Sequence, residues 1–377
     1  MPRPTQALVD LAAIRHNLGV VRRLVGPAPK LLIPVKADAY GHGAVPVARL
    51  CEQLGVDLLG IATVEEGLAL REAGIGLPLI LLGNILPTEA AAVVSHGLTA
   101  SLSDADVAAA LCRAARQAGQ RVPVFVEVDT GMGRVGVHPC EQADRFITDI
   151  AGRPELLLQA VFSHFPCADE PDARFAHEQV RRLQAVRSRV EAAGVRVPLW
   201  SMANSSAVCD LPTAHLDLVR PGIMVYGYPP SPEARCGADL RPAMSLRSAI
   251  VFLKRVRRGT SLGYGRTYEV PVDQSLVATV PIGYADGYAR ALSNRAPVLI
   301  GGRRYRVSGR VSMDQITVDL GPDSQAQVGD EVVLFGQQGP STVPVSEIAG
   351  LLDTIVYEVT CGVSRRVPRA WIDADEP

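Results

Sequence analysis

Lysine is rare in this chain of 377 residues, and one lysine stands in a setting that suits chemistry. Only Lys30, Lys36 and Lys254 occur, so arginine supplies almost all of the positive charge. Arginine stays protonated and cannot form a Schiff base with an aldehyde, whereas a desolvated lysine amine can. Lys30 and Lys254 fit ordinary surface positions, but Lys36 ends the apolar run LLIPVK (31–36). Lys36 is therefore the first candidate for covalent catalysis.

Other polar groups also end apolar runs of the sequence. His164 ends one run, Ser205 another, and Arg220 with Gly222 a third. The stretch DTGMGR (129–134) follows a fourth. Taken singly, these groups have ordinary structural explanations, such as a packed histidine, half of an ion pair, or glycines at a turn. Their significance depends on whether the fold brings them together.

The elements that would position these groups alternate along the first two thirds of the chain. Short apolar runs are separated by stretches of helical period, which is typical of a parallel sheet with crossover helices. Eight such runs occur, at residues 31–36, 58–63, 77–83, 98–103, 122–130, 158–165, 198–205 and 217–227. The pattern predicts an α/β fold with an N-terminal (β/α)8 barrel of the TIM type. An open doubly wound sheet is disfavoured, because no glycine-rich dinucleotide fingerprint follows the first run.

Active sites of such barrels lie at the carboxyl ends of the strands. Lys36, His164 and Arg220 should therefore converge on one face. The loops after the last two strands commonly hold phosphate, and Ser205 with the N–H groups near Gly222 suits that task. A lysine amine beside a phosphate cradle points to pyridoxal 5'-phosphate as cofactor, since its aldehyde requires the amine and its phosphate requires the cradle.

The pattern changes after about residue 235. Helical periodicity largely stops, and β-branched runs are punctuated by glycine and proline, as in GDEVVLFG (329–336). This predicts a mostly-β C-terminal domain. The Pro-rich segment 229–242 is the expected linker. The expected domains are a cofactor-binding barrel over 11–235 and a β-strand domain made of 1–10 plus 236–377.

Nine stretches of the sequence resemble, in order, the motifs of the alanine racemases, which are barrel-type (fold type III) enzymes dependent on pyridoxal phosphate. They are VKADAYGHG (35–43), DTGMGR (129–134), SHF (163–165), ANSSA (203–207), VRPGIMVYG (219–227), LGYGRTY (262–268), PIGYADGY (281–288), GRVSMDQ (309–315) and YEVTCGVSRRVPR (357–369). The resemblance covers essentially the whole chain. It implies an isomerase that interconverts L-alanine and D-alanine and supplies D-alanine for bacterial cell-wall peptidoglycan.

The resemblance implies a two-base mechanism. Lys36 would hold the cofactor and act as the base on the face of the substrate Cα used for D-alanine. Tyr264 resembles the opposing base, which in the family comes from the β domain of a second subunit. A homodimer with shared active sites is therefore expected. A phenol titrates at about pH 10, so Tyr264 needs a cationic neighbourhood, which His164 and Arg220 are expected to supply.

The remaining roles are also carried over by resemblance. Arg220 matches the arginine that faces the cofactor's pyridine nitrogen, and a protonated arginine would keep that nitrogen unprotonated. Arg134 and the backbone N–H of Met313, the latter from the partner, match contacts to the substrate carboxylate. The cofactor-binding set is Lys36, Tyr40, His164, Ser205, Arg220, Gly222, Ile223 and Tyr357. The expected entryway residues are Asp169, Tyr284, Arg290 and Arg310.

Two positions depart from the family pattern. Ser312 stands where the family often has cysteine, and little consequence is expected. Glu127 stands where many members carry a lysine modified by carbon dioxide, and a carboxylate cannot be modified in that way. We expect the Glu127 carboxylate to orient Arg134, either directly or through a bridging water or anion. The alternative is a solvated or strand-face carboxylate with no link to Arg134.

Composition excludes several other classes of function. A formal net charge of −1 argues against a nucleic-acid partner. No apolar run has the length of a membrane span, and the first residues lack a signal-peptide core, so no membrane partner and a cytoplasmic location are expected. The seven cysteines include no C-x-x-C pair. We expect free, mostly buried thiols and no metal site.

Three other functions compete with an alanine racemase. A racemase of broad specificity would act on serine, lysine or arginine; such enzymes tend to be exported, and a wider substrate set stays open. A non-catalytic carrier of pyridoxal phosphate would not need the C-terminal β region with Tyr264. A barrel-type decarboxylase usually pairs the pyridine nitrogen with an acid, whereas Arg220 stands at that position here.

Overall fold

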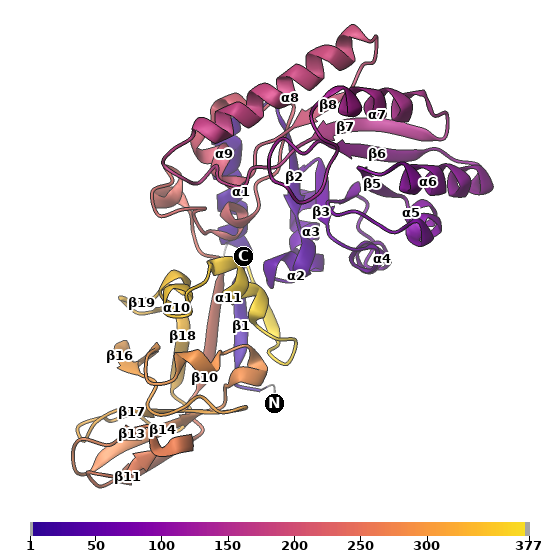
Figure 1. Cartoon of the computed structure of the whole chain (residues 1–377). Helices are drawn as coiled ribbons and strands as arrows, with labels where there is room; N and C mark the ends of the chain where they lie inside the picture. The colour runs from indigo at the N-terminus through magenta and orange to yellow at the C-terminus, as the bar shows by residue number, and fades with distance from the viewer. Residues whose placement is uncertain (1–2, 374–377) are drawn as a thin grey trace. The chain divides into compact units, whose positions relative to one another are not determined.

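The computed structural model describes residues 3–373, and the contacts within the chain divide it into two compact units (Figure 1). The barrel unit comprises Ala13–Ala39 and Gly43–Arg241. The β unit comprises Met1–Ala12, Tyr40–His42 and Pro242–Pro377. The segment Tyr40–His42 therefore belongs to the β unit, although both of its flanks belong to the barrel unit.

The barrel unit confirms the predicted (β/α)8 architecture. Its closed barrel consists of eight parallel strands: β2 (Lys30–Pro34), β3 (Leu58–Ile61), β4 (Leu79–Leu81), β5 (Leu98–Leu102), β6 (Val122–Glu127), β7 (Leu156–Phe162), β8 (Leu199–Ser201) and β9 (Leu218–Val219). Closure comes from the pairing of Lys30 with Leu218 and of Leu31 with Val219. Each strand coincides with one of the eight apolar runs, because both faces of a parallel barrel strand are buried.

Helices follow the strands as the helical stretches of the sequence predict. They are α1 (Leu11–Val25), the short turn α2 (Lys36–Tyr40), α3 (Ala44–Gln53), α4 (Val64–Glu72), α5 (Ala90–Ser95), α6 (Ala105–Ala118), α7 (Glu141–Gly152), α8 (Arg174–Ala192) and α9 (Ser205–Asp210). The bounds of α6 show the usual signals. Asp104 accepts N–H groups of the first turn, and Gly119 ends the helix with a φ of 66°.

The interior of the barrel is packed with side chains. Leu32, Ile80, Phe125, Phe162 and Leu218 belong to one buried cluster. The Phe125 and Phe162 rings meet edge to face, with centroids 6.2 Å apart. A filled core leaves no room for a substrate inside the barrel, so a functional site must lie at one end of the strands.

The β unit is built on a seven-stranded sheet with the order β16-β15-β18-β10-β1-β20, in which β19 pairs with β18. Its strands are β1 (Gln6–Asp10), β10 (Met244–Ala249), β15 (Pro297–Ile300), β16 (Arg303–Arg306), β18 (Glu331–Gln338), β19 (Ser341–Val343) and β20 (Arg369–Ile372). The first strand of the chain thus lies between β10 and β20. This unit confirms the predicted mostly-β C-terminal domain.

Smaller elements complete the β unit. A three-stranded sheet has the order β11 (Phe252–Val256), β14 (Ser275–Val280) and β17 (Ile316–Asp319), and β12 (Ser261–Leu262) pairs with β13 (Tyr268–Glu269). Two short helices, α10 (Val345–Leu351) and α11 (Val356–Gly362), stand where the sequence shows little helical periodicity. The second of them carries Tyr357.

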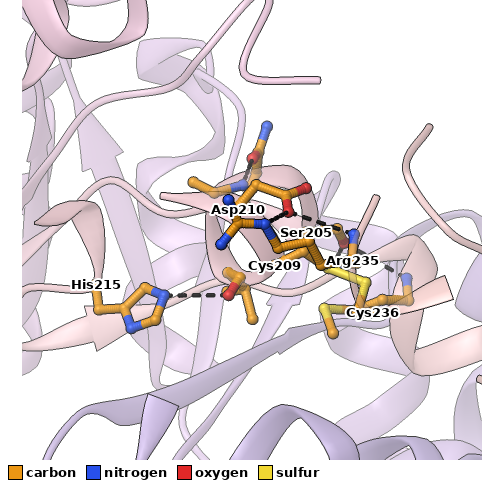
Figure 2. The surroundings of a disulfide bond; sticks show 11 residues. Ser205, Cys209, Asp210, His215, Arg235 and Cys236 are labelled. Carbon is orange, nitrogen blue, oxygen red and sulfur yellow. Dashed lines mark hydrogen bonds and ion pairs between the residues drawn. A yellow bond between two sulfur atoms is a disulfide. The ribbon is translucent and has the colours of Figure 1, made fainter. Parts of the chain in front are cut away.

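The expected linker, residues 229–242, belongs to the barrel unit up to Arg241, and Figure 2 shows its attachment at Arg235 and Cys236. Cys236 forms a disulfide with Cys209 at the end of α9. Arg235 forms an ion pair with Asp210 at 3.6 Å, and the Asn17 amide bonds to both backbone groups of Arg241. The segment is therefore part of the barrel unit's structure rather than a free connection.

The prediction of seven free thiols is wrong. Cys209 and Cys236 are 27 residues apart in sequence, with Cα atoms 5.5 Å apart, and they are bonded. Of the free cysteines that the structure describes, Cys51 and Cys112 are buried, whereas the other three are at least partly exposed. Sequence spacing carries no signal for this pair, because the linker and α9 meet only in the folded chain.

Between residues 3 and 373, no helix has both the length and the apolar character needed to cross a membrane.

Candidate active site

Lys36 follows β2 after one residue, Val35, and begins a left-handed turn. Ala37, Asp38, Ala39 and Tyr40 have φ values between 52° and 54°, which place α2 in the left-handed region. Each such residue costs roughly 1–2 kcal/mol relative to a right-handed conformation. Bonds to two carboxylates hold the turn. The Glu66 carboxylate accepts the Ala37 N–H at 2.7 Å, and the Asp38 carboxylate accepts the Ala44 N–H at 2.7 Å. Backbone strain is thus stored beside the half-buried lysine.

Arg220 lies at the centre of the barrel end and is 6% exposed. Its guanidinium donates to the Ser201 hydroxyl at 2.5 Å and to the Ser163 carbonyl at 2.7 Å. It also lies over the Phe162 ring, 5.1 Å from the centroid. Burial lowers the pKa of Arg220 to about 10, and Glu127 opposes that shift. The group therefore still carries its charge near neutral pH.

His164 is a neutral group in this setting. Its Nδ1 lies 3.3 Å from Arg220 Nη2. Arginine can only donate, so Nδ1 accepts and the proton of the neutral ring sits on Nε2. Burial, with the charges of Arg220, Arg134 and Lys36, lowers the pKa of His164 to about 3. The prediction that His164 supplies positive charge is therefore wrong, and Arg220 alone of that pair is cationic.

Glu127 ends β6 and lies among cationic groups. The residue is 3% exposed, and its Oε2 atom has no hydrogen-bond partner in the part of the chain that the structure describes. Burial raises the pKa of Glu127 to about 7, against the opposing charges of Arg220 and Arg134. This burial excludes the solvated carboxylate of the alternative and is compatible with a strand-face carboxylate at the end of β6. Within residues 3–373 no hydrogen bond joins Glu127 to Arg134, and the charge of Arg134 opposes the rise that burial causes in the pKa of Glu127.

Arg134 stands on the loop that follows β6. The Asp129 carboxylate folds this loop by accepting the N–H groups of Gly131 and Gly133, each at 3.0 Å. The Thr130 and Ser163 hydroxyls, 2.7 Å apart, fasten its base to the next strand. Arg134 itself is exposed, as is Asp169 on the loop before α8. The base of the loop is fixed, and the guanidinium at its far end is open to solvent.

The groups proposed for phosphate lie beside α9 and the turn after β9. Ser205 is 4% exposed, and its hydroxyl accepts the N–H groups of Gly222 at 2.9 Å and of Met224 at 3.4 Å. The N–H of Ile223, between them, donates to no group in residues 3–373. This N–H is available to an anion, whereas the Gly222 N–H is engaged by Ser205.

These residues are grouped here as the barrel cluster, which comprises Lys36, Glu127, Arg134, His164, Ser205, Arg220, Gly222 and Ile223. The structure confirms that the carboxyl ends of the strands carry them on one end of one unit. Sequence reasoning missed Glu66, Ser163 and Ser201. Of these, only Ser163 lies within a recognised motif, SHF (163–165).

Tyr40 and Tyr357 meet inside the β unit. Their ring centroids are 5.7 Å apart with an interplanar angle of 67°. Burial raises the pKa of the Tyr40 phenol, and the nearby Tyr357 adds to the shift. Gly41 explains the close approach of this segment to α11. A Cβ at Gly41 would lie 2.2 Å from the Thr360 carbonyl oxygen, so only glycine fits.

Five further residues form the β-unit cluster: Tyr264, Tyr284, Arg290, Arg310 and Met313. They lie on the turns η5 (Tyr264–Arg266), η6 (Tyr284–Asp286) and η7 (Arg290–Leu292) and on the loop before β17. The exposed fractions are 69% for Tyr264, 44% for Tyr284 and 52% for Met313. These are unusually open positions for large apolar side chains within one cluster.

Backbone contacts join the turns of the β-unit cluster. The Tyr284 N–H donates to the Ser312 carbonyl at 3.0 Å. The Val311 N–H donates to the Ser293 hydroxyl, which in turn bonds the Arg290 carbonyl. A Cβ at Gly265 would lie 2.9 Å from the Arg310 guanidinium, so the η5 turn packs directly on the Arg310 loop. The predicted residues of this unit are therefore neighbours.

Comparison with known proteins gives one consistent family. The family model for the alanine racemase N-terminal domain matches residues 9–230, and the model for the alanine racemase C-terminal domain matches residues 243–371. The chain is 45% identical to the alanine racemase of Symbiobacterium thermophilum, over 98% of this chain and 97% of that one. It is also 45% identical to the alanine racemase of Desulfovibrio desulfuricans, over 98% and 99%.

Solved structures agree with the sequence relatives. The alanine racemase of Clostridium difficile 630 matches with a TM-score of 0.94 at 36% identity, covering 100% of this chain and 97% of that one. A crystal structure of the Bacillus anthracis alanine racemase with bound L-Ala-P matches with a TM-score of 0.93 at 31% identity, covering 100% and 97%.

Proposed function

The chain belongs to the alanine racemase family of pyridoxal-phosphate-dependent isomerases, and from this premise we propose that it interconverts L-alanine and D-alanine by a two-base mechanism. The bases are Lys36 on one face of the substrate and Tyr264 of a second subunit on the other. The observation that carries the proposal is the barrel cluster, in which the half-buried Lys36 follows β2 and the charged, buried Arg220 follows β9, the strand paired with β2.

The barrel cluster fits pyridoxal phosphate. Lys36 supplies the amine, and the unengaged Ile223 N–H with the buried Ser205 hydroxyl supplies groups for the phosphate. Arg220 supplies a protonated donor for the ring nitrogen, because its pKa of about 10 exceeds neutral pH. The remaining phosphate ligands that we propose are Tyr40, Tyr357 and the Gly222 N–H, which would exchange its bond to the Ser205 hydroxyl for one to the phosphate. When bound, the cofactor supplies the electron sink that makes the proton on the substrate Cα removable.

The chain's own residues divide the proton transfers. The Lys36 amine takes or returns the Cα proton on one face, and the Tyr264 phenol does so on the other. Arg220 holds its proton throughout and so keeps the ring nitrogen from being protonated, which disfavours side reactions such as transamination. The neutral His164 accepts a hydrogen bond from Arg220 and fixes the direction of the guanidinium.

Substrate binding rests on two groups in this proposal. The exposed Arg134 guanidinium and the Met313 N–H of the partner subunit bind the substrate carboxylate. Asp169, Tyr284, Arg290 and Arg310 line the entryway. A C2 homodimer in which each β-strand domain completes the partner's site accounts for the exposure of Tyr264 and Met313. We propose that the domains 11–235 and 1–10 plus 236–377 act as these two parts, with residues 236–241 belonging to the barrel unit and Tyr40–His42 to the β unit.

The proposed role is the supply of D-alanine for cell-wall peptidoglycan in the cytoplasm. The purified chain should show the absorbance of lysine-bound pyridoxal phosphate and should racemise alanine faster than serine, lysine or arginine. Equal rates across that panel would favour a broad-specificity racemase. Bound cofactor without racemisation of any of the four would favour a non-catalytic carrier.

A further inference from the structure

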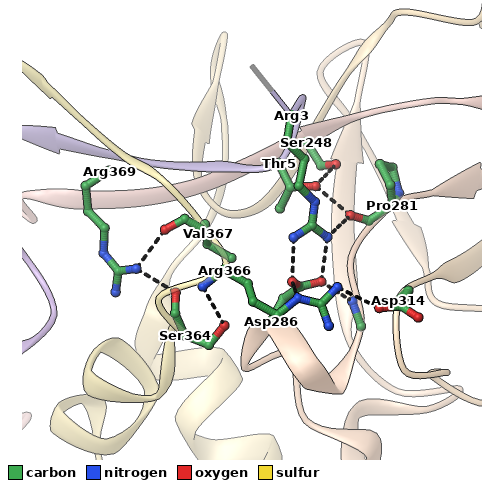
Figure 3. A network of polar contacts seen from close by, with 11 residues as sticks. Arg3, Thr5, Ser248, Pro281, Asp286, Asp314, Ser364, Arg366, Val367 and Arg369 are labelled. Carbon is green, nitrogen blue, oxygen red and sulfur yellow. Dashed lines mark hydrogen bonds and ion pairs between the residues drawn. The ribbon is translucent and has the colours of Figure 1, made fainter. Parts of the chain in front are cut away.

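Asp286 is a fully buried carboxylate on the turn that also carries Tyr284. Figure 3 shows Asp286 with Arg3 and Arg366 beside it. The Arg3 guanidinium donates to both of its oxygens, at 2.5 and 2.7 Å, and the Gly283 N–H donates to Oδ2 at 3.0 Å. Burial opposes ionisation, yet the bonds from Arg3 and Gly283 hold the pKa of Asp286 below its ordinary value. The group is therefore a charged anchor inside the β unit.

A second arginine extends this anchor to a neighbouring loop. Arg366 Nε lies 3.5 Å from Asp286 Oδ1, and Arg366 Nη2 donates to Asp314 Oδ1 at 2.7 Å. The charges alternate from Arg3 through Asp286 and Arg366 to Asp314, so the network is neutral as a whole. Asp314 directly follows Met313 in the chain.

The two loops are also in backbone contact. The Ala285 N–H donates to the Met313 carbonyl at 3.1 Å, and the Tyr284 N–H donates to the Ser312 carbonyl at 3.0 Å. A Cβ at Gly283 would lie 2.3 Å from the Ser312 carbonyl oxygen, so no other residue allows this approach. Bonds on either side of Met313 thus fix the orientation of its peptide groups.

The Met313 N–H is the group that this arrangement leaves available. Its carbonyl is engaged by Ala285, whereas its N–H donates to no group in residues 3–373. The residue is 52% exposed. An oriented, unengaged N–H on an exposed loop is suited to bind an anionic oxygen.

We propose that Asp286 is a positioning residue that aims the Met313 N–H at a substrate carboxylate, acting through Arg366 and Asp314. The inference rests on the proposed function, in which Met313 contacts that carboxylate. Asp286 touches neither substrate nor cofactor. Its effect is to hold the loop 309–315 against the turn 281–288, so that the N–H need not be ordered when the substrate binds.

The test compares variants at the two ends of the network in the full-length, cofactor-loaded protein. In Asp286→Asn the amide cannot accept hydrogen bonds from both Arg3 donors. The loss of the negative charge also weakens the electrostatic attraction of Arg366 to this position. We expect KM for alanine to rise about tenfold, the loss of one hydrogen bond to a charged group, while kcat changes less than threefold. The inhibition constant of propionate, a carboxylate without an amine, should rise by the same factor.

Asp314→Asn is the companion variant that spares the core, because the Asp314 side chain is 56% exposed. We expect a smaller rise of about twofold to threefold in KM, with the melting temperature unchanged. Asp314→Glu keeps the charge and should restore the wild-type KM. The matched control is Glu331→Gln, which breaks the Arg247–Glu331 ion pair of 2.8 Å on the sheet and should leave KM unchanged.

The outcomes separate this inference from the proposed function. If the wild-type chain racemises alanine but Asp286→Asn keeps the wild-type KM and propionate constant, Asp286 is only structural and the inference is wrong. A fall in kcat alone would also contradict it, because the Met313 contact is made with the carboxylate. If the wild-type chain itself fails to racemise alanine, the proposed function fails instead.

Discussion

The barrel cluster and the β-unit cluster are built by different physical means. In the barrel cluster Glu127 and Arg220 are buried, although Arg134 is exposed, and desolvation moves the pKa of His164 to about 3, of Glu127 to about 7 and of Arg220 to about 10. In the β-unit cluster the side chains of Tyr264 and Met313 are exposed. The turns and loops that carry these side chains are held together by backbone hydrogen bonds, and glycines allow one loop to approach the next closely.

This difference indicates which function each cluster can perform alone. Buried, interacting charges can tune a reacting group within one chain. Exposed aromatic and methionine side chains have no such environment until another surface covers them. The barrel cluster, with the proposed phosphate ligands Tyr40 and Tyr357 of the same chain, should therefore bind the cofactor without a second chain, and the β-unit cluster should act only after assembly.

The largest effect is expected at Lys36. Lys36→Ala removes the only amine in the barrel cluster, so racemisation in both directions should fall below detection. Lys30→Ala and Lys254→Ala serve as controls and should keep wild-type rates, because both positions are expected to be ordinary surface lysines. Borohydride reduction followed by peptide mapping should place the cofactor on Lys36. Labelling of Lys30 or Lys254 instead would contradict the assignment.

The second prediction tests assembly of the two clusters. Lys36→Ala and Tyr264→Ala chains should each be inactive, and mixing them should restore activity. A heterodimer of the two contains one site with both bases intact. The measurement is the rate of racemisation by heterodimers purified through two different tags. Inactive heterodimers of verified composition would show that each site is built from a single chain.

The third prediction concerns stability at the barrel cluster. Burial raises the pKa of Glu127 from 4.5 to about 7, so the folded chain holds a proton that the unfolded chain releases between those values. The contribution of Glu127 to stability should therefore fall as pH rises from 4.5 to 7, whereas the contribution of His164, whose pKa is lowered from 6.5 to about 3, should rise with pH up to about 6.5. The comparison with Glu127→Gln isolates the first contribution, because His164 is present in both chains. Glu127→Gln has no carboxylate to ionise inside the protein. Above pH 7 it should therefore be more stable than the wild type, by up to about 3 kcal/mol. Urea unfolding at pH 5 and pH 8 measures the difference.

The same variant should lose function as it gains stability. Without the Glu127 carboxylate, the exposed Arg134 loses a charge that orients it, and KM for alanine should rise severalfold. Added bicarbonate should not change the activity of the wild-type chain, because no lysine stands at position 127. Wild-type kinetics in Glu127→Gln, or a carbamate mass shift on any lysine, would refute this account.

The sequence predicts the fold more completely than the site, for physical reasons. The eight barrel strands are recognisable because burial on both faces demands apolar runs, and Lys36 stands out because it ends the first of them. The left-handed turn after Lys36 depends on carboxylates of other segments, such as Glu66. The neutral state of His164 depends on its burial next to Arg220. Such effects arise from tertiary contacts, which no local pattern encodes.

The disulfide between Cys209 and Cys236 gives the last and smallest expected effect on activity (Figure 2). It joins α9, which begins at Ser205, to the segment that leads out of the barrel unit. Closing a loop over a separation of 27 residues stabilises a fold by about 2–4 kcal/mol, mainly by restricting the unfolded chain. Cys236→Ser should therefore lower the melting temperature without reductant and leave the rate of racemisation unchanged.

Reductant supplies the internal control for this prediction. Dithiothreitol should bring the wild-type melting temperature down to that of Cys236→Ser and should not change the variant. Cys140→Ser, at an exposed free cysteine, should respond to reductant as the wild type does. Thiol counting on the unfolded protein without reductant should find Cys209 and Cys236 blocked. If both react, or if reductant leaves the wild-type melting temperature unchanged, the pair is not bonded in solution, and the ion pair of Asp210 with Arg235 holds the segment instead.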